Sequence, residues 1–117
     1  MQNQQKNKEH GQLSIDIYET ASQLLIVAPI AGVTLEEINV SVTEDVLTIK
    51  GERKFDQKIA DDNLVIQECF WGEFSRSIVL PTNVDSTKIQ ASFKNSILTI
   101  SMPRSERTRT KVVKIKT

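Results

Sequence analysis

Residues 72–103 read GEFSRSIVLPTNVDSTKIQASFKNSILTISMP, and this stretch decides the fold. Apolar and polar side chains alternate in three short runs, and turn residues separate the runs. In the first run Phe74, Ile78 and Leu80 share one face, and Pro81 ends the run. An apolar period of two between turn residues is typical of half-buried β-strands. The stretch therefore predicts three consecutive strands of an antiparallel β domain.

The second and third runs lie on either side of a tight turn at residues 94–96. In the second run Ile89, Ala91 and Phe93 alternate with polar residues, and the third run covers residues 97–102. Alternation predicts further strands at residues 13–18, 38–42 and 46–50, and residues 64–70 also read as a strand. Residues 24–28 are a continuous apolar run, which predicts a strand covered on both faces. Eight closely spaced strands, with no helical period longer than two turns, predict an all-β sandwich.

The length and composition fit a single globular domain. A chain of 117 residues is one domain, and it can bury one hydrophobic core. The longest apolar run, residues 24–33, contains Pro29 and Gly32 and is too short to span a bilayer. Residues 1–12 are polar and show no secretory signal. A single cysteine precludes an intrachain disulfide. We therefore expect a cytoplasmic location and no membrane insertion.

Charge is unevenly distributed along the chain, although the formal net charge is zero. Residues 104–117 hold six of the fifteen basic residues and one of the fifteen acidic residues, so this tail carries +5 and residues 1–103 carry −5. A basic tail can attract nucleic acid or an acidic protein surface. The tail contains no aromatic side chain on which a base could stack. We therefore expect no nucleic-acid partner.

The residue types that catalysis and metal binding need are scarce. Ser-His-Asp and Cys-His sites need a histidine on the folded scaffold, but the one histidine, His10, lies in the polar N-terminal segment. A zinc site needs about four protein ligands, and one histidine with one cysteine cannot supply them. The glycines match no phosphate-binding loop. We therefore expect no enzyme activity, no catalytic residue, no metal and no cofactor.

The opening stretch also carries short motifs in a specific order. They are Phe-x-Arg at 74–76, Leu-Pro at 80–81, Val-Asp at 84–85 and Ala-x-x-x-Asn-x-Ile-Leu at 91–98. Together these motifs resemble the signature of the α-crystallin domain, the core of the small heat shock proteins. Residues 46–53, VLTIKGER, are similar to the fifth strand of that domain and its exit. The resemblance implies an immunoglobulin-like antiparallel β-sandwich.

The resemblance also divides the chain into three parts. It implies a short disordered N-terminal arm at residues 1–12, an α-crystallin domain at residues 13–103 and a flexible basic C-terminal extension at residues 104–117. Within the extension, Val113-Lys114-Ile115 resembles the C-terminal Ile-x-Ile motif of the family.

The function that the resemblance implies is that of an ATP-independent holdase chaperone, which binds partly unfolded proteins and limits their aggregation. Its partners would be non-native client proteins and other copies of the same chain, first in a dimer and then in a higher homo-oligomer. Two other interpretations stay open. One is a co-chaperone or adaptor sandwich that does not oligomerise, and the other is a nucleic-acid-binding protein that uses its basic tail.

Two apolar stripes and the tail motif form the predicted binding site. The resemblance implies that the two strands carrying these stripes edge a groove between the sheets, where clients or a tail can dock. Val113 and Ile115 can enter this groove together because the strand period is two, while Lys114 points to water. The predicted groove residues are Ile38, Val40, Val42, Ile89, Ala91 and Phe93. The arginine of the family at the position of Arg76 lies at the dimer interface.

A long excursion lies between Gly51 and Gly72, as in bacterial and plant members of the family, where it carries a strand that is exchanged between partners. Its first part, residues 52–63, is highly charged and lacks a sustained period. Cys69 alternates with Phe70, and we expect it to be a small buried hydrophobic residue.

The hairpin turn at Asn95-Ser96 departs from the family, which usually has Asn-Gly there. An Asn-Gly pair suits a turn that needs positive φ at both central positions. Serine in a left-handed conformation costs about 1 kcal/mol. The turn is therefore either strained or of another type.

Overall fold

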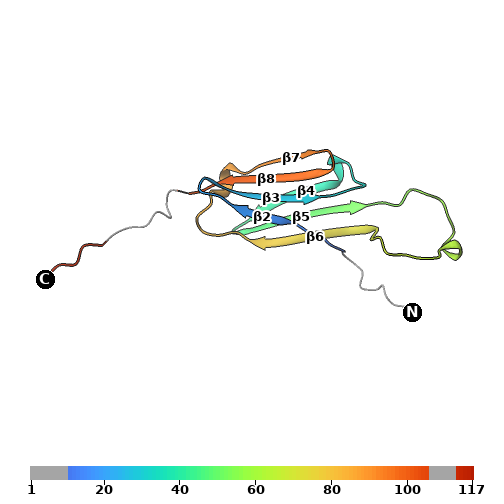
Figure 1. Cartoon of the computed structure of the whole chain (residues 1–117), viewed down its shortest axis with the longest axis horizontal. Helices are drawn as coiled ribbons and strands as arrows, with labels where there is room; N and C mark the ends of the chain where they lie inside the picture. Colours follow the sequence, from blue (N-terminus) through green and yellow to red (C-terminus); the bar gives the residue numbers. More distant parts are fainter. Residues whose placement is uncertain (1–10, 106–112) are drawn as a thin grey trace.

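Two four-stranded sheets face each other in the computed structural model, which describes residues 11–105 and 113–117 (Figure 1). The first sheet has the order β1-β6-β5-β4 and the second has the order β2-β3-β8-β7. The only parallel pair is β1 with β6, and all other pairs in the described residues are antiparallel. The expected antiparallel β-sandwich is confirmed.

The strands of the first sheet are β1 (Gly11–Gln12), β4 (Ile38–Thr43), β5 (Val46–Arg53) and β6 (Gly72–Val79). Those of the second sheet are β2 (Asp16–Glu19), β3 (Gln23–Pro29), β7 (Gln90–Lys94) and β8 (Ile97–Pro103). Three short 3-10 helices lie in the connections: η2 (Leu35–Glu37), η3 (Asp61–Asn63) and η4 (Ser86–Lys88).

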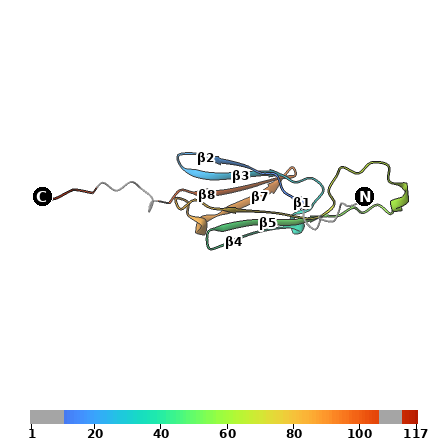
Figure 2. The same cartoon turned by 90° about the horizontal axis from the view of Figure 1, so that it is seen from below.

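One hydrophobic core fills the space between the two layers, which Figure 2 shows from the side. Along β3 and β8, and in the first half of β5, every second side chain is buried, because successive residues of a strand point to opposite faces. The buried side chains are Leu13, Leu24, Ile26, Ala28, Ile30, Leu47, Ile49, Phe74, Leu80, Leu98, Ile100 and Met102. The expectation that residues 24–28 are covered on both faces was wrong, because only alternate side chains of β3 are fully buried; the alternation of residues 46–50 did predict the buried face of β5.

Three details of the expected strand pattern were wrong. Residues 64–70 form no strand, because they lie in a long excursion from the sandwich and have no neighbouring strand with which to pair. The predicted strand at 13–18 is shorter, and β2 covers only Asp16–Glu19. Gly11–Gln12, expected to be part of a disordered arm, form β1. Residues 1–10 of that arm, including His10, lie outside the described residues.

Of the two geometries expected for the turn between β7 and β8, the structure has the one with positive φ at both central residues, which is strained for serine. Asn95 has a φ of 55° and Ser96 a φ of 63°, and the flanking residues Lys94 and Ile97 are paired in the ladder. Positive φ at both central residues is the requirement of a type I′ hairpin turn. Ser96 therefore adopts a backbone conformation that glycine would adopt at lower cost.

Candidate functional site

The edge strands β4 and β7 both lie along the upper side of the sandwich in Figure 1. Each ends its own sheet, so the backbone groups on its outer side have no partner strand in the described residues. Unpaired edges of this kind are templates for an added strand. An extended peptide could therefore pair with either edge at this side of the molecule.

Five of the six predicted groove residues lie on these two edge strands, and Ile89 immediately precedes β7. Val40 of β4 is opposite the buried Ile49, and Phe93 of β7 is opposite the buried Leu98, so both edges turn their apolar side chains towards the core. Five of the six residues are half-buried and pack against the core, whereas Ala91 is exposed. We call the six residues the edge stripes: Ile38, Val40, Val42, Ile89, Ala91 and Phe93.

The tail motif is not buried in this single chain. The side chains of Val113 and Ile115 are 74% and 91% exposed. Residues 106–112, which connect the motif to the sandwich, lie outside the described residues. The predicted docking of the motif into a groove of another copy therefore stays a prediction.

A second apolar surface lies on the excursion, which comprises residues 54–71 and extends away from the sandwich between β5 and β6 (Figure 1). Val65 is 90% exposed on it. The excursion borders an open cavity of about 750 Å³. Its exposed large apolar residues are Phe55, Ile59, Leu64, Val65, Ile66 and Trp71. Large contiguous patches of exposed apolar side chains are typical of interaction surfaces.

The excursion is held at its neck by Arg53, the last residue of β5. Its Nε donates to the carbonyl O of Ala31 at 2.7 Å, and its Nη1 donates to that of Phe70 at 3.3 Å. The guanidinium also lies 5.3 Å from the ring centroid of Phe74. This contact between the two ends of the excursion was not predicted, because its partners are far apart in the sequence.

Two aromatic residues of the excursion contact each other, and its cysteine lies open. The ring centroids of Phe55 and Trp71 are 5.1 Å apart, a normal distance for an aromatic pair. Cys69 is exposed and lines the excursion cavity, so the expectation of a buried cysteine was wrong. The alternation with Phe70 predicts a buried face only where a second layer covers the segment, and none does here.

Arg76 is half-buried on the core-facing side of β6, opposite Ile49. Its Nη1 donates to the carbonyl O of Leu13 at 3.1 Å. Among the described residues, no carboxylate lies within ion-pair distance of this guanidinium. Its predicted place at a dimer interface stays a prediction.

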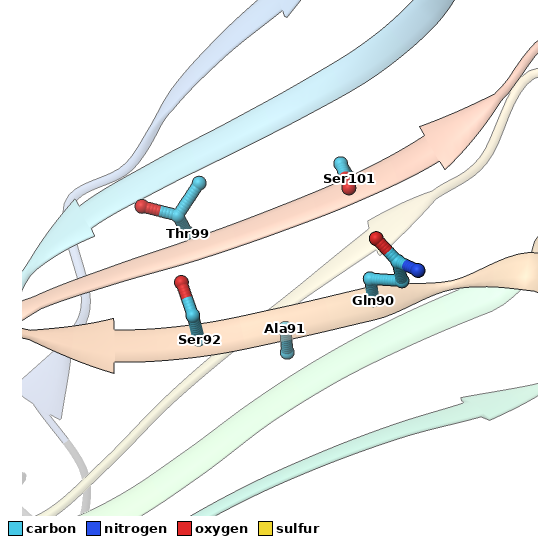
Figure 3. A pocket seen from close by; sticks show the side chains of 5 residues that line it. All are labelled: Gln90, Ala91, Ser92, Thr99 and Ser101. Carbon is cyan, nitrogen blue, oxygen red and sulfur yellow. The ribbon is translucent and has the colours of Figure 1, made fainter.

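A polar hollow of about 440 Å³ lies on the outer face of the second sheet (Figure 3). Gln90 and Ser92 of β7 and Thr99 and Ser101 of β8 point to this face, whereas Ala91 points to the other face. The hollow offers hydroxyl and amide groups but no titratable side chain. Within residues 11–105 and 113–117, no group of three or more His, Cys, Asp or Glu residues could hold a metal ion.

A family model described as the Hsp20/alpha crystallin family matches residues 16–116. The chain belongs to this family. Small heat shock protein C4 of Rickettsia felis is 37% identical over 100 residues, which cover 86% of this chain and 61% of that protein. Heat shock protein 16 of Schizosaccharomyces pombe is 33% identical over 109 residues, which cover 90% of this chain and 76% of that protein.

Solved structures of small heat shock proteins have the same fold. A protein from Xylella fastidiosa, reported to have a distinct high order structure, matches with a TM-score of 0.73 and 28% identity, over 90% of this chain and 96% of that chain. Heat shock protein 16.0 from Schizosaccharomyces pombe matches with a TM-score of 0.70 and 26% identity, over 94% and 80%. The sandwich is therefore an α-crystallin domain.

Membership of the family supports a chaperone role, since small heat shock proteins are generally ATP-independent chaperones and not enzymes. This chain spans only 61% and 66% of the two Rickettsia felis small heat shock proteins that it matches. No helix in the described part of the chain is long and apolar enough to cross a membrane.

Proposed function

We propose that this protein is an ATP-independent holdase chaperone that binds partly unfolded proteins in the cytoplasm and limits their aggregation. The observation that carries the proposal is the placement of the edge stripes on two open edges at one side of the sandwich. Such an edge offers main-chain hydrogen bonds to any extended segment, and the stripe offers apolar contact to its alternate side chains. Binding of this kind needs no particular client sequence and no nucleotide.

A dimer is the proposed building block. In the exchange that the family resemblance implies, residues 64–70 of one copy add to a sheet of a second copy. The edge strand β2 offers a suitable acceptor, because its residues Ile17 and Tyr18 are exposed and its outer side has no partner strand in the described residues. Pairing there would give residues 64–70 the ladder that they lack in a single chain and would cover their exposed apolar side chains.

Higher assembly would use the tail. Val113 and Ile115 would occupy the edge stripes of a neighbouring copy, and each contact would contribute roughly 1.5–3 kcal/mol before ordering costs. Single contacts of this strength exchange readily, but many of them in one assembly act multivalently. Clients would then compete with the tail for the same edges, and their binding would shift the population towards open edges.

The experiment measures light scattering from a heated model client. Scattering should fall when near-equimolar protein is added, and it should fall equally with and without ATP. Unchanged scattering at all ratios would exclude holdase activity. Ala91→Glu should weaken the effect by placing a charge on an exposed position of the edge stripes. The matched control is Ser92→Glu on the opposite face of β7, and equal suppression by both variants would show that clients bind elsewhere.

A further inference from the structure

Where the C-terminal tail leaves the sandwich, backbone contacts to residues 22, 83 and 84 hold Arg104 and Ser105 on both sides; we call this place the slot. Beyond the end of β8, the backbone N of Arg104 donates to the carbonyl O of Ser22 at 3.0 Å. The backbone N of Ser105 donates to the carbonyl O of Asn83 at 2.8 Å. Arg104 also forms an isolated β-bridge with Val84 on its other side. The path of the chain is thus fixed through Ser105, two residues past the end of β8.

Side chains close the slot around Arg104. Its Nη1 donates to Oε2 of Glu19 at 2.9 Å and to the carbonyl O of Thr20 at 3.1 Å. Nδ2 of Asn83 donates to the same Oε2 at 3.3 Å. One carboxylate oxygen therefore joins the end of β2, the loop before η4 and the root of the tail. We call Glu19, Asn83 and Arg104 the tail-root clasp.

The clasp orients the chain more than it stabilises the fold. The side chains of Arg104 and Glu19 are 33% and 49% exposed, and ion pairs this open to solvent contribute little to folding stability. The geometry of the contact is nevertheless specific, because Nη1 of Arg104 donates both to the carboxylate of Glu19 and to the carbonyl O of Thr20. This pair holds the chain at the point where the tail leaves the sandwich, directly before residues 106–112.

The length of chain beyond the clasp limits where the tail motif can bind. Val113 follows Ser105 by eight residues, and eight residues span at most about 29 Å when fully extended. The edge stripes that receive Val113 and Ile115 must therefore lie within that distance of the slot. Within this limit, the direction in which the tail leaves the slot decides which neighbouring copy the motif can reach.

We infer that the tail-root clasp selects the neighbour to which the tail binds, and so positions subunits in the assembly. The inference rests on the proposed docking of Val113 and Ile115. A tail that leaves in one direction has fewer conformations to lose on docking than a tail that swings freely, so docking is favoured by pre-organisation.

The test compares Arg104→Glu, Glu19→Arg and the double variant that carries both changes, each in the full chain. Each single change places like charges together. The apparent dissociation constant for assembly beyond the dimer should then rise about two- to tenfold, the range for releasing one ordered side chain. The double variant restores an opposite pair and should recover the wild-type distribution of native masses. Wild-type masses for both single variants would overturn the inference.

A truncated background separates positioning from damage to the sandwich. In a chain that ends at Ser105, the same changes should leave the native masses and the thermal midpoint as in the truncated parent. Altered masses there would show that the clasp acts on the sandwich and would overturn the inference. Val113→Gly with Ile115→Gly gives the remaining control. If this tail variant assembles normally, both the proposed docking of the tail and the inferred role of the clasp are wrong. If it disassembles while Arg104→Glu does not, only the inferred role of the clasp is wrong.

Discussion

Ser96 adopts a left-handed backbone conformation that is unfavourable for serine, and the surrounding fold holds it there. The two-residue turn from β7 to β8 forces positive φ on it, and its carbonyl O accepts a hydrogen bond from the backbone N of Ile30 at 2.8 Å. Ile30 is fully buried in the core. The turn is therefore tied to the start of the 30–37 connection and cannot relax into a longer loop without breaking that bond.

Ser96→Gly should raise the free energy of unfolding by about 1 kcal/mol, because glycine has no left-handed penalty. Urea unfolding at one fixed protein concentration measures the change, since assembly makes the midpoint concentration-dependent. Ser92→Gly, inside β7, is the matched control and should destabilise the fold by about 0.5–1 kcal/mol. A lower midpoint for Ser96→Gly would mean that the turn has another geometry in solution.

Single residues also mark the limit of what a sequence pattern predicts. Phe74 and Leu80 are buried as their alternation predicts. The contact between Glu19 and Arg104 joins residues 85 positions apart, and no local period carries information about it. Contacts of this kind follow from the three-dimensional path of the chain and not from any window of sequence.

At the scale of elements, the excursion is where sequence and structure differ most. Its residues 64–70 have the apolar character of a strand, yet a strand is stable only with a neighbour to which it can bond. The ladder of β5 and β6 continues to the pair Arg53 and Gly72, so the excursion begins at residue 54 and not at 52. The strand signal in 64–70 fits a segment that finds its partner on another copy.

Replacing residues 54–71 by Asn-Gly should give monomers with an intact sandwich. The last ladder pair, Arg53 and Gly72, would then be joined by a two-residue turn that suits the twist of the two strands. Sedimentation at equilibrium measures the mass, and circular dichroism checks the sheets. Lys58→Ala, an exposed change within the excursion, is the control and should remain dimeric. Dimers of the shortened chain would show that exchange is not what holds the subunits together.

The sandwich itself was largely predictable from the sequence. The alternation of β4 to β7 places most of their apolar residues on the core side, with Val79 as an exposed exception, and the turn residues bound the strands. The division of residues 13–18 into a buried Leu13 and a separate β2 was not predictable, because the same alternation continues across both parts. The edge stripes were placed on the right strands, but the exposure of Ala91 depends on its position at an edge.

For the whole molecule, the main question is how weak contacts combine. In the proposed assembly each subunit has two such contacts, because its tail binds at one neighbour's edge and its own edge receives another neighbour's tail. Their strength is limited by the small apolar area of one valine and one isoleucine. An assembly of this design can release single edges to clients without coming apart.

Changing both Val113 and Ile115 to Gly should shrink assemblies beyond the dimer and leave the thermal midpoint of the dimer almost unchanged. The reason is that these side chains are exposed in the single chain and contribute nothing to its core. Native mass spectrometry across temperature measures the distribution.

Lys114→Ser is the matched control for the tail, because its side chain should face solvent when its neighbours dock. It should change the mass distribution much less than the double change does. If the double variant keeps the wild-type masses while Lys114→Ser disperses the assembly, the tail acts through its charge and docking of apolar side chains is wrong.

The short strand β1 has a consequence for growth of the assembly. It lies against β6, and the backbone N of Leu13 continues the contact by donating to the carbonyl O of Ser75 at 3.2 Å. One rim of the first sheet is thus capped by the chain's own N-terminal part. β1 pairs with Phe74 and Ser75 of β6, so a second molecule that joined its β6 along this whole edge would have to displace the N-terminal part. Strand addition to the first sheet is therefore favoured at its other edge, β4.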